Sequence, residues 1–369
     1  MFEKLTTWFN VYKRIRFFKE MYPLSAIIKD IFLFPVDYLL NNGNIGIVRN
    51  VTMAITHRCN LRCEMCYFHE KLNNTCDLSL EIYKCTIDAL KKGRPCIILS
   101  GGEPFLHRNL IEMVTYAKEA GLPVQIFSNG TLIKPNLVDS LVKIGLDYID
   151  FTLLGNENSH SKIANVSGAY KKFRENIAYF SENRGNTKII LNYTVTPKAI
   201  KDINHAVELV KIYRLDGLRI QHYNFLLPGE FKAQEEIIAR LFSRESATHE
   251  IESTVDMHGI SDQLIEFKKQ LPINLPKVPV QWVPTLSNSE IRHWYSSKRF
   301  NTSRKCLYPW RGILIDADGK IYPCSKIYLE LGDLKNTEVF NAWNCDNMHN
   351  FRTHLKKKLF PACSRCCKL

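Results

Sequence analysis

No cysteine lies between Cys96 and Cys306, although the 369-residue chain contains 12 of them. Such bunching is unlike a disulfide framework, which spreads over a small secreted domain. Residues 1–20 lack the apolar core and the small-residue cleavage site of a signal peptide. The longest apolar stretch, 31–40, contains a proline and an aspartate and is too short to span a bilayer. We therefore expect a protein of the reducing cytoplasm.

The chain carries a formal charge of +13, from 50 lysines and arginines against 37 aspartates and glutamates. An excess of this size favours polyanionic partners in general, namely nucleic acid, acidic lipid surfaces or anionic substrates. No basic run is interleaved with aromatic residues between 51 and 224, which argues against specific nucleic-acid recognition. The length and the apolar fraction of 45% indicate a globular protein with a large core and a smaller appendage.

Residues 1–50 form an N-terminal extension with the pattern of a basic amphipathic helix. Apolar side chains recur at helical spacing, and lysines and arginines interrupt them. The apolar positions are Trp8, Val11, Tyr12, Ile15, Phe18 and Met21. Two interpretations stay open. Either the apolar stripe packs on the body of the protein, or residues 1–45 attach to an anionic membrane surface or an apolar substrate.

From residue 51 onward, short apolar strands alternate with helices. Strands are expected at 51–56, 96–100, 123–128, 148–154, 188–196 and 217–222. Helices are expected at 79–92, 109–120, 134–144, 169–181 and 201–213. This alternation predicts parallel strands with right-handed crossovers, in either an open sheet or a partial barrel. In both arrangements the chemistry belongs at the C-terminal ends of the strands.

Three cysteines, Cys59, Cys63 and Cys66, directly follow the first expected strand. Three nearby thiolates can hold an iron–sulfur cluster, but a cube of four irons needs four ligands. Structural metal sites are fully ligated by the protein, whereas catalytic sites keep one position open. With three cysteine ligands, the fourth iron would be open to a substrate or cofactor. The spacing C-x3-C-x2-C is informative without being decisive when it stands alone.

The C-terminal part holds a second group of cysteines. After polar helices and prolines at 225–304, two alternating runs around Asp318-Gly319 predict a β-hairpin, and a helix is expected at 337–357. The cysteines that flank these elements are Cys306, Cys324, Cys363 and Cys366. Four thiolates suit one closed 4Fe–4S cluster or a tetrahedral zinc ion, and the spacing alone leaves both open.

Together these signals resemble the radical S-adenosylmethionine (SAM) superfamily. The three cysteines are followed by Ser100-Gly101-Gly102-Glu103-Pro104 after the second strand and by Ser128-Asn129-Gly130-Thr131 after the third. The C-terminal cysteines are similar to the SPASM or shorter twitch extension of such enzymes. The resemblance implies an α/β fold, a partial (β/α)6 TIM-like barrel with a small cysteine-rich C-terminal α+β extension. The implied parts are an N-terminal extension (1–50), the barrel (51–224), a linker (225–304) and an auxiliary cluster domain (305–369).

The resemblance also implies roles for individual residues. Cys59, Cys63 and Cys66 would hold a catalytic [4Fe–4S] cluster whose open iron binds SAM. The expected contacts of SAM are Met65 and the Tyr67 backbone at the adenine, Gly101, Gly102 and Glu103 at the methionyl ammonium, and Ser128 and Asn129 at the ribose or methionyl part. The expected ligands of an auxiliary [4Fe–4S] cluster, with zinc as the alternative, are Cys306, Cys324, Cys363 and Cys366. Cys345 and Cys367 are spare.

An enzyme of this kind would be oxygen-sensitive, would cleave SAM reductively to a 5'-deoxyadenosyl radical and would abstract hydrogen from a substrate C–H bond. The electron would come from a donor such as flavodoxin or ferredoxin. Modification of a peptide or protein is favoured. A lipid-like or other small metabolite is the alternative, because the N-terminus is basic and aromatic and Leu154 replaces the aspartate that is common after the fourth strand of such enzymes. A non-catalytic zinc or nucleic-acid-binding protein is the second alternative.

Overall fold

The computed structural model describes residues 36–38, 46–66, 68–243, 257, 259–275 and 277–369. The basic helix expected within residues 1–50, together with its expected membrane contact, lies almost wholly outside these ranges. Within the described ranges, no helix is both long enough and apolar enough to cross a membrane.

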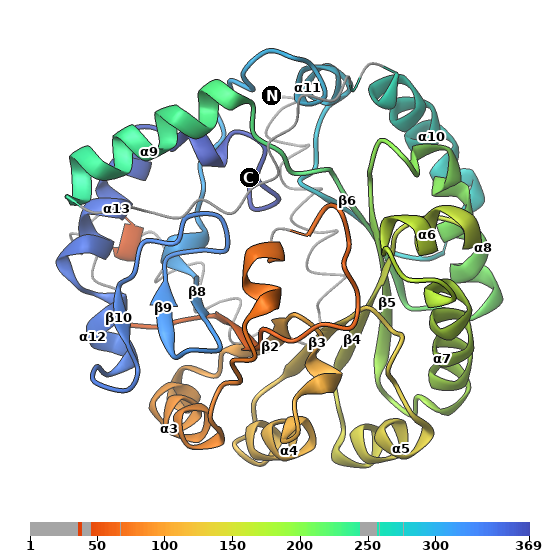
Figure 1. The fold of residues 1–369 in the computed structure, drawn as a ribbon, viewed down its shortest axis with the longest axis horizontal. Coiled ribbons are helices and arrows are strands. Elements are labelled where there is room, and N and C mark those ends of the chain that lie inside the picture. The colour runs from red at the N-terminus through yellow and green to blue at the C-terminus, as the bar shows by residue number, and fades with distance from the viewer. Residues whose placement is uncertain (1–35, 39–45, 67, 244–256, 258, 276) are drawn as a thin grey trace.

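One sheet of ten strands curves through the molecule, in the order β10-β9-β8-β1-β2-β3-β4-β5-β6-β7. Seven consecutive strands pair in parallel: β1 (Asn50–Thr56), β2 (Cys96–Gly101), β3 (Val124–Ser128), β4 (Tyr148–Leu153), β5 (Lys188–Thr194), β6 (Gly217–Gln221) and β7 (Val280–Val283). The helices between them lie on the outside of the curved sheet (Figure 1). They are α3 (Leu80–Leu90), α4 (Leu110–Glu119), α5 (Pro135–Ile144), α6 (Glu157–Ile163), α7 (Ala169–Asn183) and α8 (Ile203–Ile212). The predicted α/β partial barrel is confirmed.

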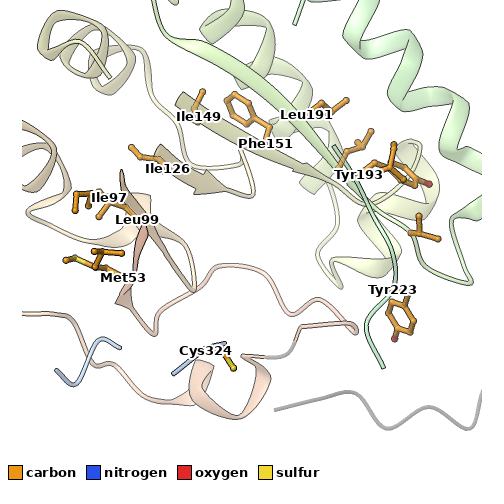
Figure 2. Close-up of a cluster of buried hydrophobic side chains, with 14 of the residues drawn as sticks. Met53, Ile97, Leu99, Ile126, Ile149, Phe151, Leu191, Tyr193, Tyr223 and Cys324 are labelled. Atoms are coloured by element: carbon orange, nitrogen blue, oxygen red, sulfur yellow. The ribbon is translucent and has the colours of Figure 1, made fainter. Parts of the chain in front are cut away.

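The two faces of the parallel strands differ in polarity, because successive side chains point to opposite sides of a sheet. The outward face is apolar and packs under the helices, as Ile126 and Phe151 illustrate (Figure 2). The inward face carries half-buried side chains that include Ser100, Thr152 and Gln221. Parallel strands are usually buried on both faces. The half-buried side chains of this barrel show instead that solvent reaches its inner face, and a ligand can bind there.

The stretch 225–304 is more than the linker that the sequence predicted. It contains α9 (Pro228–Phe242), α10 (Ile260–Asn274), α11 (Asn288–Trp294) and the strand β7, which pairs with β6. The barrel therefore has seven parallel strands rather than six. The sequence did not reveal β7 because prolines at 279 and 284 flank it, and proline-rich stretches are typical of loops.

The cysteine-rich C-terminal domain continues the barrel sheet. β8 (Gly312–Ile315) pairs in parallel with β1, and β9 (Lys320–Tyr322) and β10 (Gly332–Asp333) follow in antiparallel pairing. The hairpin predicted around Asp318-Gly319 is confirmed, and Gly319 adopts the left-handed φ of +88° that its turn requires.

The remaining short elements complete the chain. The single helix expected at 337–357 is two helices, α12 (Val339–Trp343) and α13 (Asp346–Lys357), because Cys345 between them is extended. Single 3-10 turns occur at His69–Asn73, Lys91–Gly93, Pro104–Leu106, Ile200–Asp202, Tyr308–Trp310 and Pro361–Cys363.

Candidate cofactor and cluster sites

Cys59, Cys63 and Cys66 lie together in the loop after β1, at the C-terminal end of the parallel strands. Burial is the main cause that raises the pKa of Cys59 to about 11 and that of Cys63 to about 12, and the neighbouring thiols add to both shifts. Burial likewise raises the pKa of Cys66. Neutral thiols of this kind become good ligands when a metal displaces their protons. The three side chains therefore fit an iron–sulfur cluster.

Glu103, directly after β2, is a fully buried carboxyl group near these cysteines. Its carboxylate accepts hydrogen bonds from the Ser128 hydroxyl at 2.9 Å, the Asn129 amide at 2.8 Å and the Phe105 amide at 3.2 Å. Burial raises its pKa to about 7, although these donors oppose the shift. No basic side chain in the described residues forms an ion pair with Glu103. A buried carboxylate of this kind fits the ammonium group of SAM.

Gly101 and Gly102 bring the end of β2 against the loop after β1 that carries Cys59, Cys63 and Cys66, called the cysteine loop from here on. A Cβ atom would lie 2.4 Å from the Thr56 carbonyl oxygen at Gly101 and 2.2 Å from the Arg58 carbonyl oxygen at Gly102, closer than real contacts allow. The backbone amides of Gly102 and Glu103 donate to these two carbonyls, each at 2.8 Å. The glycines are therefore needed for close approach to the cysteine loop, in addition to the approach to a ligand that the sequence suggested.

Ser128 and Asn129 hold the loops around the site in place. The buried Ser128 hydroxyl donates to Glu103 and accepts from the Gly130 amide, each at 2.9 Å, so its single donor is used within the protein and one acceptor position is left. The Asn129 side chain donates to Asn60 at 3.0 Å and accepts from the Thr131 amide at 2.9 Å. Its amide nitrogen also lies 3.9 Å from the Cys59 sulfur. Asn129 thus links the third strand to the cysteine loop.

Met65 and Tyr67 are the other two predicted contacts of SAM near the cysteines. Met65 is half-buried and packs beside Leu61 and Leu154 under the cysteine loop, whereas Tyr67 lies outside the described residues. Leu154 is itself buried, and it forms one apolar cluster with Leu61 and Ile163. Its apolar character is explained by this packing, which removes it as an indication of an apolar substrate.

Sequence reasoning missed several residues that fix the cysteine loop. Arg58 donates to Asp77 at 3.1 Å and to the Leu106 carbonyl at 2.7 Å, and the Thr56 hydroxyl donates to Asp77 at 2.6 Å. Lone charged residues outside a motif carry no local signal, so only the fold could bring them together. Asp316, from the turn between β8 and β9, also reaches this loop through His57 and Lys71.

The auxiliary cysteines Cys306, Cys324, Cys363 and Cys366 are all buried. Burial raises the pKa of Cys306 to about 12, and the nearby Cys324 adds to this rise. Cys366 lies close to both Cys363 and Cys367. A hydrogen bond from Cys366 lowers the pKa of Cys367. Cys367 therefore lies beside the predicted ligands rather than apart from them.

Arg365 fixes the segment that carries Cys363 and Cys366. Its fully buried guanidinium donates to Glu230 of α9 at 2.8 Å, to the Trp294 carbonyl of α11 at 2.7 Å and to the Lys298 carbonyl at 2.7 Å. The predicted linker thus supplies the wall against which the auxiliary cysteines are placed.

Among the residues that the structure describes, no three His, Cys, Asp or Glu side chains converge closely enough to hold one metal ion. A cube of four irons separates its thiolate ligands more widely than a single ion does. Thiolates are ligands of both groups, so these four cysteines suit either a cluster or a zinc ion in chemical type.

Two family models match the chain. The model of the radical SAM superfamily matches residues 53–210, and that of the SPASM iron–sulfur cluster-binding domain matches residues 306–367. The chain therefore contains a radical SAM domain and a SPASM domain. Its cofactors are a [4Fe–4S] cluster and SAM in the barrel, with auxiliary iron–sulfur chemistry in the C-terminal domain, and members of this class are enzymes.

Individual relatives differ in what their names describe. The chain is 30% identical over 210 residues to Fe-coproporphyrin III synthase of Methanosarcina barkeri, a match that covers 56% of this chain and 52% of that protein. It is 23% identical over 336 residues to the antilisterial bacteriocin subtilosin biosynthesis protein AlbA of Bacillus subtilis, covering 86% of this chain and 66% of AlbA. The chain thus spans about half to two thirds of these relatives.

A solved structure confirms the fold. Streptococcus suis SuiB bound to its precursor peptide SuiA superimposes with a TM-score of 0.63 at 14% identity. The match covers 92% of this chain and 80% of SuiB.

Proposed function

We propose that this enzyme cleaves SAM reductively and removes a hydrogen atom from a C–H bond of its substrate, with Cys59, Cys63 and Cys66 as the ligands of the catalytic cluster. The observation that carries the proposal is the buried Glu103 carboxylate, which lies near the half-buried Cys59 thiol and forms no ion pair with a basic side chain in the described residues. When bound, the cluster and SAM supply the electron transfer and the radical chemistry, while the protein binds, orients and shields them.

Glu103 has the central binding task in this proposal. Its carboxylate would accept charge-assisted hydrogen bonds from the SAM ammonium. Ser128 and Asn129 hold that carboxylate in position through the two hydrogen bonds described above. The remaining proposed contacts of SAM are Gly101, Gly102, Met65, the Tyr67 backbone, and Ser128 and Asn129 at the ribose or methionyl part.

The C-terminal domain holds the second proposed cluster. Cys306, Cys324, Cys363 and Cys366 would saturate one auxiliary [4Fe–4S] cluster, which leaves no iron open for a substrate. The domain boundaries that go with this assignment are the predicted ones, except that β7 and the helices of 225–304 pack as part of the barrel and of the auxiliary site.

A peptide or protein is the substrate class that we propose first. AlbA is named for the biosynthesis of a bacteriocin, and SuiB binds a precursor peptide. A small metabolite is the second candidate, favoured by the similarity to Fe-coproporphyrin III synthase. The lipid hypothesis loses the support of Leu154, and membrane contact through residues 1–45 stays a proposal. So do a flavodoxin or ferredoxin donor and a cytoplasmic location.

Anaerobic reconstitution tests the cluster assignment. Two cubes require about eight irons per chain, and the wild-type protein should form 5'-deoxyadenosine from SAM when it is reduced. Alanine at Cys59, Cys63 or Cys66 should lower the iron content to about four per chain and abolish 5'-deoxyadenosine. Cys85→Ala is the matched control, because Cys85 is exposed on α3. Retained activity in any of the three variants would overturn the assignment.

Mass spectrometry of candidate substrates separates the two substrate classes. A peptide encoded beside the gene should lose hydrogen or gain a crosslink in a SAM-dependent reaction. An unchanged peptide together with a converted iron porphyrin would favour the small-metabolite alternative.

A further inference from the structure

A single buried carboxylate joins the two ends of the cysteine loop to the C-terminal domain. Asp316 lies in the turn between β8 and β9 and is 0% exposed. Its Oδ1 atom lies 2.7 Å from Nε2 of His57, and its Oδ2 atom pairs with the Lys71 ammonium. His57 comes two residues before Cys59, and Lys71 comes five residues after Cys66. The same side chain thus holds both flanks of the loop.

The Lys71 ammonium also faces aromatic rings, that of Phe68 at 5.8 Å and two from the C-terminal domain. It lies 4.1 Å from the ring centroid of Tyr328 and 5.2 Å from that of Tyr322, within the range of cation–π attraction. Asp316 also accepts the Ala317 amide at 2.9 Å, so the turn itself orients the carboxylate. Lys71 is therefore enclosed by one carboxylate and two aromatic rings of the domain that carries the auxiliary cysteines.

The free-energy cost of burying the Asp316 carboxylate ties this residue to its two partners. A carboxylate withdrawn from water is costly unless charged or hydrogen-bonding groups compensate it. Here the compensating groups are the imidazole and the ammonium at the two flanks of the loop. A shift of the loop away from the β8–β9 turn would separate Asp316 from both groups. The contact therefore favours one position of the cysteine loop.

We propose that Asp316 is a positioning residue for the catalytic cluster, through which the C-terminal domain sets the geometry of the cysteine loop and hence the affinity of the site for SAM. The inference rests on the proposed function, because it takes Cys59, Cys63 and Cys66 as cluster ligands. Residues that orient metal ligands from outside the ligand set commonly change metal affinity or activity by about 10- to 100-fold when they are replaced.

The test compares Asp316→Asn with wild type in the full-length, anaerobically reconstituted protein. Asparagine keeps the volume of the side chain and removes its charge. Two measurements are made: the dissociation constant of SAM, and the change that SAM produces in the electron paramagnetic resonance spectrum of the reduced protein. Only a cluster with an open iron responds to SAM, so the second measurement isolates the catalytic cluster. Asp318→Asn is the matched control, because Asp318 lies in the same turn and, within the described residues, its carboxylate accepts a single hydrogen bond, from the Lys320 amide.

Asp316→Asn should weaken SAM binding on the order of tenfold and alter the SAM-induced spectral change, while Asp318→Asn behaves as wild type. Wild-type affinity and spectrum in Asp316→Asn overturn the inference. An equal effect of both substitutions also overturns it, because the cause is then the folding of the hairpin. If Asp316→Asn does not fold, Lys71→Met decides by the same two measurements. A wild-type protein without any SAM-induced change would refute the proposed function instead.

Discussion

Glu103 illustrates at the scale of one residue how a binding site differs from a stable core. The side chain is fully buried and accepts three hydrogen bonds, yet burial still raises its pKa to about 7. A group whose pKa is raised by folding destabilises the protein when it is ionised at higher pH. A bound ammonium would remove this cost. The unfavourable burial of Glu103 is therefore explained if SAM binds there.

The pH dependence of SAM binding follows from the raised pKa of Glu103. A protonated carboxyl cannot pair with an ammonium, so affinity should fall as the pH drops below about 7. Between pH 6 and pH 7.5 the ionised fraction rises about eightfold, and the dissociation constant should fall by a similar factor. Titration calorimetry on the reconstituted enzyme measures this. Glu103→Gln should bind SAM weakly at both pH values, and an unchanged slope in that variant would contradict the assignment.

At the scale of elements, the auxiliary cysteines depend on helices that lie far away in the sequence. Arg365 lies between Cys363 and Cys366 and is bonded to Glu230 of α9 and to the end of α11. The Ala362 amide also donates to Gln234 of α9 at 3.0 Å. The helices of 225–304 are therefore part of the auxiliary site.

Arg365→Met should destabilise the protein strongly, because it leaves Glu230 buried without its partner. Removal of one member of a buried ion pair costs about 3–5 kcal/mol. Arg292→Met is the control, because the pair of Arg292 with Asp262 is exposed and should contribute about 0–1 kcal/mol. Urea unfolding measures both variants. The iron content of Arg365→Met should also fall toward about four per chain, which corresponds to one cube, and equal stability of the two variants would refute this role.

At the scale of the whole molecule, the barrel and the C-terminal domain share one sheet. β8 pairs with β1 along four residue pairs, from Asn50↔Gly312 to Met53↔Ile315. The side chains of Ile313 and Ile315 belong to the same buried core as those of the barrel strands. The two family domains are therefore a single structural unit despite the 95 residues between their matched ranges (211–305).

A shared core predicts cooperative unfolding of the two domains. Denaturant unfolding of the cluster-free protein should show one transition, with coincident midpoints by circular dichroism and tryptophan fluorescence. A fragment that ends at residue 304 should be insoluble, because it exposes the β1 edge that β8 covers. Two separate transitions, or a soluble folded fragment, would show that the domains are independent.

Local patterns in the sequence were sufficient for the parallel strands β1 to β6, the hairpin at Asp318-Gly319 and the cysteine motifs. Periodicity and turn residues depend on neighbours in the chain, so they are visible without a structure. β7 was missed because its proline-rich setting has the composition of a loop. The break between α12 and α13 was missed because an apolar pattern does not mark one extended residue.

The sequence by itself determined which residues are equipped for the chemistry: three cysteines after one strand, and Glu103 after the next. Only the tertiary structure decided what holds them. Asp316 reaches the cysteine loop across 259 positions from His57, and Arg365 reaches Glu230 across 135. These contacts depend on the pairing of β8 with β1 and on the packing of α9 against the C-terminal segment. Burial then sets their strength, and burial is a property of the folded chain alone.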